Sequence, residues 1–448
     1  MSDNSYESLR RLLSDSKIQE LQKKIKILDN SKVINWEEEV VFTTDLKESN
    51  WRPDLIIAID GDYSKQIINN GFPGAEVGYI TVSTVMILMD KLKALEGSRF
   101  VDPQLYREVE QSSSIDSLMV GANVVLNGEA SAKSSMRKMF YEKLEEVRIS
   151  DNTESLLDTY EAMLKIRWQS KSTLPQCPHD DCTARLEKKV GQYNCANCGG
   201  KIYSTDNLRL HELMQPSGTN GEMYGRIKET IKQLQLIHLL RSFEQKEGWF
   251  DLLGHIAFFI EGSLAIPSTS SWLAKSFRAE LNRINKKVKE QCGLDLLIVG
   301  IERTGNFVNH FSDIDVKKDG TKDNFPNQAA YLLTNDYIKD NIVLNDSPTY
   351  VYLKDTSFGR KFFYKNKSGY RVVPSIATFT NYQSNPKTAF PAQFPRLSDC
   401  LMLLDKLVSA KYNNSVLPLA TAHAEAAIPL NLGNAIFENM AREIREKK

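Results

Sequence analysis

Three short apolar runs, each long enough for one buried strand, constrain the fold of this 448-residue chain most strongly. They span residues 55–59, 255–260 and 294–301, and long stretches with helical periodicity separate them. Continuous apolar runs of this length are typical of strands buried on both faces, and their alternation with helices favours an α/β or mixed sheet core. Residues 77–89 are expected to form a neighbouring strand and residues 349–376 a hairpin.

Helices are expected over most of the remaining chain. Apolar spacing predicts helices at residues 5–28, about 222–246, 272–291, 399–412 and about 430–445, and a mostly helical, charged region over residues 104–168. Residues 1–49 are interpreted as an N-terminal helical arm, with Asp15 or Ser16 as the N-cap of its helix. That arm either docks on a partner or packs on the protein's own core.

Four of the six cysteines lie within 22 residues. They are Cys177, Cys182, Cys195 and Cys198. Their x4 and x2 spacings let two pairs of thiolates reach one ion, and zinc closes its tetrahedral shell with four cysteines. With no position left for water, the predicted zinc is structural, and Gly199 and Gly200 suit the tight turn that follows. The alternatives are unligated cysteines, or His179 in place of one cysteine.

Two of the apolar runs are followed by an acidic residue and a glycine. Asp60-Gly61 follows the first run and Glu261-Gly262 the second. Neighbouring strands lie about 4.8 Å apart, so two carboxylates at the ends of such strands can share one or two divalent cations, and Mg²⁺ and Mn²⁺ favour carboxylates. The alternative is that each acid is a simple turn residue.

A histidine and several basic residues complete the candidate set. His423 lies among small residues, where it can orient a phosphate or move a proton, unless it is a core histidine. Arg303 follows the third apolar run, and Lys286 and Lys287 lie on the helix predicted at 272–291. These three cations are candidates for binding DNA phosphates, although exposed basic residues are common.

The overall composition limits the class of protein. The formal net charge is zero, which speaks against a stand-alone nucleic-acid binder but is compatible with a local basic groove or a partner that delivers the DNA. The polar N-terminus and the absence of a long apolar run predict a cytoplasmic protein without a membrane segment. The sequence has no ATP-binding P-loop, so any pumping of DNA requires another protein.

Five segments, in order along the chain, resemble the NurA family of nucleases, which work with the HerA hexameric DNA translocase. They are AIDGDY (58–63), FFIEGSLAI (258–266), GIERTGNFVNHF (300–311), PRLSDCLMLLDKL (395–407) and YNNSVLPLATAHAEAAIP (412–429). The resemblance covers most of residues 50–445. The cysteine cluster resembles an insertion that some bacterial members carry between the two acidic strands.

This resemblance implies an RNase H-like mixed sheet core with flanking helices at residues 50–445, interrupted by a helical region at 100–170 and an embedded zinc ribbon at 174–204. It implies a Mn²⁺ or Mg²⁺ site, a homodimer, and DNA end processing with a HerA-like hexameric ATPase, in DNA repair or antiphage defence. Both settings use the same chemistry.

Site residues follow from the same resemblance. Asp60 matches the first metal-binding aspartate, and Glu261 matches the second, where the family usually has Asp. His423 matches the C-terminal histidine, Tyr412 a nearby tyrosine, and Glu244 a glutamate on the helix before the second acidic strand. The alternatives to Glu244 are Glu222, Glu229 and Glu247.

The sequence therefore predicts a metal-dependent deoxyribonuclease, acting as an exonuclease, an endonuclease or both. The main alternative is a non-catalytic zinc-ribbon adaptor of a translocase, which the departure at Glu261 keeps open. A third possible function is that of an unrelated zinc-ribbon DNA-binding factor. It would bind duplex DNA without a divalent metal and with a steep salt dependence.

Overall fold

A nine-stranded mixed sheet forms the centre of the computed structural model, in the order β1-β9-β10-β11-β8-β7-β2-β3-β4. The structure describes residues 11, 13–25, 36–68, 71, 73–90, 110–170, 173–266, 271–316, 324–343, 347, 351–352, 354, 356–380, 385–408, 414–427 and 442.

Three parallel strands in the middle of this sheet correspond to the three apolar runs. They are β2 (Leu55–Ile67), β7 (Ile256–Glu261) and β8 (Leu297–Glu302). In β7, Phe258 packs into the apolar cluster on one face of the sheet and Phe259 into the cluster on the other. Burying each ring contributes about 1.5–3 kcal/mol, which explains why this strand is apolar throughout. Because the three strands are parallel, the residues at their carboxyl ends gather at one edge.

Antiparallel strands extend the sheet on both sides. The prediction of a strand at 77–89 is confirmed by β3, which pairs with β2, and the predicted hairpin is confirmed by β10 and β11. The flanking strands are β3 (Glu76–Leu88), β4 (Glu110–Val120), β11 (Arg371–Ala377), β10 (Gly359–Lys365), β9 (Ala329–Leu332) and β1 (Val41–Phe42).

The prediction of a mostly helical region at 104–168 is wrong for β4. From Ser114 to Met119 the side chains alternate as in a strand, with Ile115, Ser117 and Met119 buried and the residues between them exposed or half-buried. The serines of this segment obscure the alternation in the sequence, and pairing with β3 supplies the backbone hydrogen bonds. The following part is helical as predicted, in α6 (Ala132–Glu146) and α7 (Leu156–Trp168).

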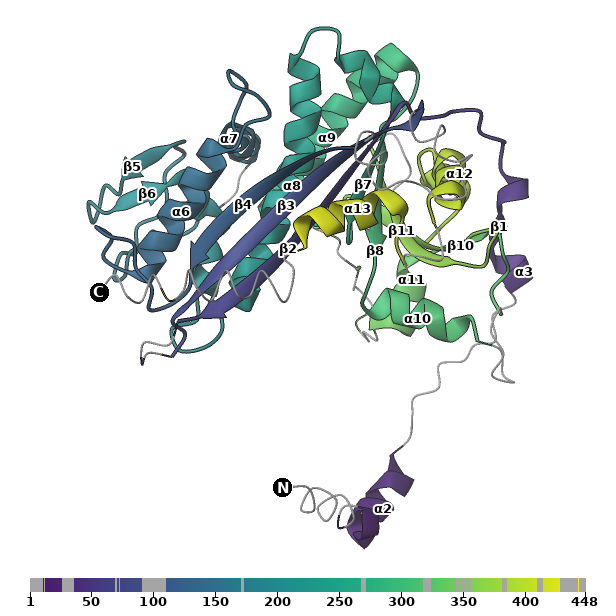
Figure 1. Ribbon diagram of the computed structural model, residues 1–448, viewed down its shortest axis with the longest axis horizontal. Coiled ribbons are helices and arrows are strands. Elements are labelled where there is room, and N and C mark those ends of the chain that lie inside the picture. The colour runs from purple at the N-terminus through teal and green to yellow at the C-terminus, as the bar shows by residue number, and fades with distance from the viewer. Residues whose placement is uncertain are drawn as a thin grey trace.

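Helices cover both faces of the sheet, which confirms the predicted α/β class. With α6 and α7, the helices α8 (Gly221–Gln245) and α9 (Ser271–Cys292) pack on the face that carries Phe258. On the opposite face lie α12 (Leu397–Leu407) and α13 (Leu417–Ala426). Figure 1 shows α13 crossing in front of the long strands and α8 behind them.

Smaller elements complete the ends of the sheet. The helices α10 (Asn306–Ile314) and α11 (Asn335–Ile338) pack over β9 and β10. The short hairpin of β5 (Gln192–Asn194) and β6 (Lys201–Tyr203) lies beside α6 (Figure 1). The helix predicted at about 430–445 falls outside the described residues, apart from Arg442. No helix in the described part of the chain is both long and apolar enough to span a membrane.

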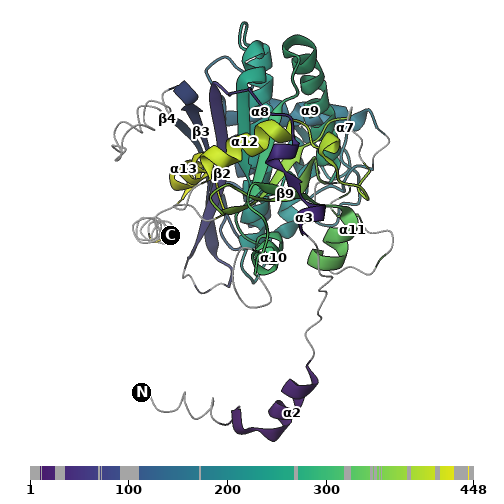
Figure 2. The ribbon, with the colours of Figure 1, turned by 90° about the vertical axis from the view of Figure 1, so that its right-hand side faces the viewer.

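The N-terminal helix α2 (Ser16–Lys24) has no buried residue and lies apart from the sheet (Figures 1 and 2). Asp15 caps it by accepting a 2.8 Å hydrogen bond from the backbone of Lys17, which confirms the predicted N-cap. The main body begins at α3 (Trp36–Glu39), because the buried Trp36 ring lies 5.1 Å from that of Phe325. Residue 36 therefore already belongs to the packed body.

Two buried histidines predict a loss of stability in mild acid. Burial lowers the pKa of both His211 and His238 to about 4, from an ordinary value near 6.5. Because the folded pKa is depressed, the stabilisation is complete above about pH 6.5 and falls as the pH drops toward 4. We expect each histidine to reduce the free energy of unfolding at pH 5 by about 1–2 kcal/mol relative to pH 7.

Urea unfolding at the two pH values measures this loss. His238→Gln removes one titrating ring and leaves an amide to bond Thr159, whose hydroxyl lies 2.8 Å from His238 Nδ1. The variant should therefore show a smaller difference between pH 7 and pH 5. An unchanged difference would contradict the assignment to His238.

Candidate active site and metal centre

The carboxylate of Asp60 lies on the central strand β2 and is almost completely buried. Its Oδ1 accepts a 2.6 Å hydrogen bond from the backbone N–H of Gly61. Its Oδ2 lies 3.3 Å from Nη1 of Arg303 and 3.1 Å from Nδ1 of His423. The structure thus brings together three of the predicted site residues, one from β2, one from the loop after β8 and one from α13.

The strand that carries Asp60 is longer than expected. The prediction that β2 ends at Asp60-Gly61 is wrong, because β2 pairs with β3 as far as Ile67. Gly61 does not make a turn. A Cβ atom there would lie 3.2 Å from Cγ of Lys228, so this glycine allows α8 to approach the sheet closely. Gly262, in contrast, has a φ of 87°, a left-handed conformation that glycine adopts readily.

Glu261 lies at the end of β7, beside Asp60. The pairing of Ile59 with Ile260 places Asp60 and Glu261 at equivalent positions on adjacent parallel strands. Glu261 Oε2 lies 2.6 Å from Nζ of Lys232, and the backbone oxygen of Glu261 accepts a second bond of 2.8 Å from the same ammonium group. The two acids predicted from the sequence are therefore neighbours, and a lysine from α8 contacts the second.

Glu229, on α8, is the helix glutamate that lies near Glu261. Asp60, Glu229 and Glu261 are together called the acidic group. Glu229 Oε2 lies 3.0 Å from Nζ of Lys232, which joins it to Glu261, and Glu229 Oε1 lies 3.0 Å from Nζ of Lys228. Burial alone would lower the pKa of Lys232, but the carboxylates of Glu229, Glu261 and Asp60 outweigh it and raise that pKa above its ordinary value. Lys232 is therefore an ammonium ion, although its side chain is fully buried.

Glu244, the sequence-based choice for the helix glutamate, lies elsewhere. It is 15 residues beyond Glu229 on the same helix, which corresponds to about 22 Å at 1.5 Å per residue. Its carboxylate pairs with Arg283 at 2.6 Å and with Lys287 at 2.5 Å. The hydrogen bond from Arg283, with that from Lys287, lowers the pKa of Glu244 to about 2. Glu244 thus joins α8 to α9, and Glu229, one of its alternatives, takes the place beside Glu261.

The two lysines predicted to bind DNA both lie on α9. Lys287 pairs with Glu244, and Lys286 is exposed, 3.9 Å from Glu290. Both lie near the carboxyl end of α9, which leads into β8 and so adjoins the edge of the sheet where the parallel strands begin. The acidic group lies toward the opposite edge. Of the three candidate cations, only Arg303 contacts it. Tyr412 falls outside the described residues.

A third strand-end acid was missed in the sequence. Glu302 ends β8, as Glu261 ends β7, and its carboxylate contacts the buried Lys361 and the hydroxyl of Ser263. Glu261, Glu302 and Arg303 line a cavity of about 330 Å³. The sequence contains this pattern, because Glu302 directly follows the third apolar run, as Asp60 and Glu261 follow the first two.

Asp60 Oδ2 and His423 Nδ1 are a candidate pair of ligands for a divalent cation. Octahedral bonds of about 2.1 Å set neighbouring ligand atoms about 3 Å apart, and His423 Nδ1 and Asp60 Oδ2 are separated by 3.1 Å. That nitrogen is buried and makes no hydrogen bond of good geometry. Asp60 and Glu261 supply the carboxylates that Mg²⁺ and Mn²⁺ prefer. Each of these acids already contacts a positively charged side chain of the protein. Arg303 contacts Asp60, and Lys232 contacts Glu261.

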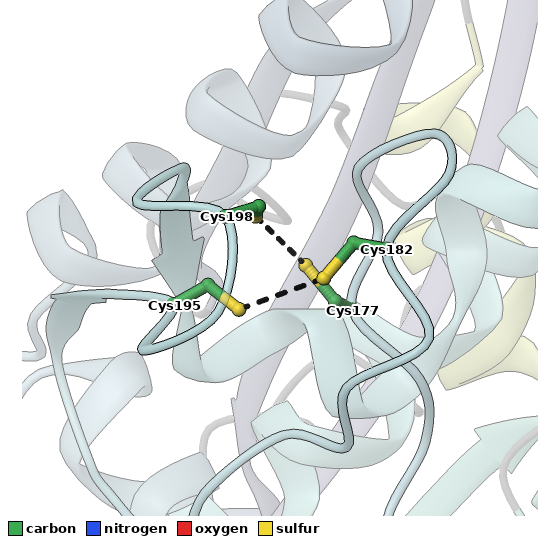
Figure 3. A group of neighbouring side chains, drawn as sticks. All are labelled: Cys177, Cys182, Cys195 and Cys198. Atoms are coloured by element: carbon green, nitrogen blue, oxygen red, sulfur yellow. Dashed lines mark hydrogen bonds between the residues drawn. The ribbon is translucent and has the colours of Figure 1, made fainter.

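The four clustered cysteines point toward one another (Figure 3). Their sulfur atoms all lie within 4.8 Å of one another, and no other group of three or more potential metal ligands is this close in the described part of the chain. Two of the sulfur pairs, Cys177–Cys198 and Cys182–Cys195, are each 3.8 Å apart. A tetrahedron with zinc–sulfur bonds of about 2.3 Å sets its sulfur atoms about 3.8 Å apart. The thiols could therefore hold a zinc ion.

Neighbouring groups support this cluster. A hydrogen bond from Asn197, with one from the backbone of Ala184, lowers the pKa of Cys182 to about 6, whereas burial raises the pKa of Cys177 to about 12. Gly199 has a φ of 71°, as the predicted tight turn requires. His179 Nδ1 lies 3.2 Å from the sulfur of Cys177, but it is not part of the mutually close set of ligand atoms.

Comparison with known proteins gives the family. A family model described as the NurA domain matches residues 54–428. The chain belongs to the NurA family. The NurA family is a nuclease family, and the mixed sheet with helices on both faces agrees with the mixed sheet core and flanking helices that the sequence predicts. The four-cysteine cluster lies inside the matched region of this NurA domain.

Two solved structures are similar to this NurA-family chain over nearly its whole length. The NurA nuclease from Sulfolobus solfataricus is 12% identical, with a TM-score of 0.33, over 100% of this chain and 99% of that one. A second structure, described as NurA, is 10% identical, with a TM-score of 0.25, over 99% and 98%. A search of the curated proteins finds no match.

Proposed function

We propose that this NurA-family protein is a divalent-metal-dependent deoxyribonuclease that hydrolyses phosphodiester bonds at DNA ends. One observation carries the proposal. The buried carboxylate of Asp60 lies next to Glu261 on a parallel strand and contacts both Arg303 and His423. Two acids, an imidazole and a guanidinium are groups that can serve metal-assisted phosphodiester hydrolysis.

Each residue has a distinct role in this proposal. Asp60 and Glu261 would hold a Mn²⁺ or Mg²⁺ ion, with His423 beside it. The bound ion would lower the pKa of a water molecule and reduce the negative charge on the phosphate. Arg303, whose side chain is partly exposed, binds a phosphate oxygen through its free N–H groups. His423 orients the phosphate or transfers a proton.

The partners remain part of the proposal. We expect a homodimer that works in the cytoplasm with a HerA-like hexameric ATPase, in DNA repair or antiphage defence. The net charge of zero supports delivery of DNA by another protein, since electrostatic attraction alone would not concentrate it. We also propose that the four cysteines bind a structural zinc ion, which the tetrahedral sulfur separations support.

Cleavage of end-labelled linear DNA by the purified, zinc-loaded protein tests the function. The assay is run with Mn²⁺, Mg²⁺ or EDTA, alone and with the cognate translocase and ATP. We expect digestion that needs the divalent ion. An absence of digestion under every condition would leave the non-catalytic adaptor, which is supported by Glu261 in the place of the usual aspartate and by the cations that already contact both acids.

Arg303→Ala is expected to weaken cleavage by about 10- to 100-fold. A charged hydrogen bond to phosphate contributes about 1.5–3 kcal/mol, and loss of that bond removes the phosphate contact beside Asp60. The rate of cleavage against DNA concentration measures this effect. Lys286→Ala is the matched control, because this exposed cation lies away from Asp60, and it should cleave like the wild type. Equal losses in both variants would instead indicate a general charge effect.

A further inference from the structure

Lys232 occupies a cage of oxygen atoms inside the proposed site. Its Nζ lies 3.1 and 3.0 Å from the two carboxylate oxygens of Glu229, 2.6 Å from Oε2 of Glu261 and 2.8 Å from the backbone oxygen of Glu261. The side chain is fully buried, whereas Glu229 and Glu261 are partly exposed. This ammonium group therefore stands between two carboxylates of the acidic group.

A metal ion between these carboxylates would need the same oxygens. Mg²⁺ and Mn²⁺ bind oxygens at about 2.1 Å, in a nearly octahedral shell, and such an ion would have to displace Lys232. Displacement is unfavourable, because Lys232 starts from α8 inside the protein and would be left as a buried charge without partners.

Charge balance leads to the same result. Asp60, Glu229 and Glu261 carry three negative charges, and Arg303, Lys228 and Lys232 contact them with three positive charges. One divalent ion adds a double positive charge, which a phosphodiester and a hydroxide can neutralise. A second ion would leave excess positive charge in a partly buried site.

We propose that Lys232 is a built-in cation of this site, which ties Glu229 to Glu261 and leaves room for one exchangeable divalent ion, beside Asp60. The inference rests on the proposed function, since it concerns the metal of that same site. Lys232 acts as a positioning residue. It fixes Glu261 from α8, and the number of ions follows from its presence.

Manganese stoichiometry tests the inference without an activity assay. Zinc-loaded wild-type protein is titrated with Mn²⁺, and free ion is measured by electron paramagnetic resonance. We expect one tightly bound Mn²⁺ per chain, and none in Asp60→Asn. Two ions per wild-type chain, or the spectrum of an exchange-coupled pair, would overturn the proposal.

Substitution of the lysine gives the second measurement. In Lys232→Ala, Glu229 and Glu261 lose their shared cation, so we expect the stoichiometry to rise from one ion to two. Mn²⁺ should also raise the melting temperature of this variant more than that of the wild type. A variant that stays at one ion and gains no extra stabilisation would overturn the proposal. If the variant does not fold even with Mn²⁺, the wild-type stoichiometry decides alone.

Lys365→Ala is the matched control. Lys365 is also fully buried, and its Nζ lies 3.0 Å from a carboxylate oxygen of Asp315 and 3.1 Å from the backbone oxygen of Phe325. Its loss should destabilise the protein without changing the Mn²⁺ stoichiometry. A failure of the nuclease assay with one bound ion would reject only the proposed function, and metal-dependent cleavage with two bound ions would reject only the role of Lys232.

Discussion

The Asp60→Asn variant is expected to cleave linear DNA about 10³-fold more slowly than the wild type, with its fold retained. Asparagine has nearly the same shape and keeps an oxygen for the N–H of Gly61. It removes the charge that would hold the metal ion and that Arg303 and His423 contact. Loss of a principal electrostatic group in a preorganised site typically slows the reaction by 10²–10³-fold or more. Single-turnover cleavage in Mn²⁺ measures the rate.

Asp405→Asn is the control for this substitution. Asp405 lies on α12, where its carboxylate accepts a 2.9 Å hydrogen bond from the hydroxyl of Tyr364. The change of charge and shape is the same as in Asp60→Asn, but away from the acidic group. We expect wild-type cleavage from this variant and matching thermal unfolding from both. Wild-type rates from Asp60→Asn would place the chemistry elsewhere in the protein.

Loss of zinc is expected to unfold the cysteine-containing segment while the nine-stranded sheet remains folded. The apolar cluster in this segment is small, and three of its five buried members are the cysteines themselves. Binding of structural zinc contributes on the order of 10 kcal/mol to folding in small domains. Little else would hold the two loops together after Cys195→Ser or removal of the ion. Hydrogen exchange in residues 174–204, with zinc content measured in parallel, follows the effect.

Cys292→Ser provides the comparison. Cys292 is half-buried at the end of α9 and lies outside the cluster. It should keep both the zinc and the protection of residues 174–204. If zinc-free wild-type protein retained full protection there, the thiols would be an ordinary packed cluster, and the structural role of the ion would be wrong.

The strands that form the site could be predicted from their apolar runs, since β2, β7 and β8 are buried on both faces. The cysteine cluster could be predicted equally well, because its four cysteines are close in sequence. The residue at which β2 ends could not be predicted from the sequence. The second half of β2 alternates between half-buried and exposed residues, and pairing with β3 holds it. Tertiary pairing, rather than local preference, determines where that strand ends.

The choice among the helix glutamates shows a second limit. Glu222, Glu229 and Glu244 all lie on α8, a helix of 25 residues. Spacing along the sequence does not tell which turn of a long helix faces the end of a strand. In the structure, Lys232 contacts both Glu229 and Glu261, so Glu229 is the helix glutamate that lies near the end of β7. The contact between Arg303 and Asp60 was also unpredictable from the sequence, because it joins residues from β2 and the loop after β8.

The position of His423 has a consequence for how the protein is made. Asp60 belongs to the first long strand of the sheet, whereas His423 lies on α13, 363 residues later in the sequence. Domains form progressively as the polypeptide leaves the ribosome, so the growing chain carries Asp60 long before its histidine exists. The proposed site is then completed only after α13 has been synthesised. A polypeptide terminated before α13 would lack this imidazole, so its proposed site would be incomplete.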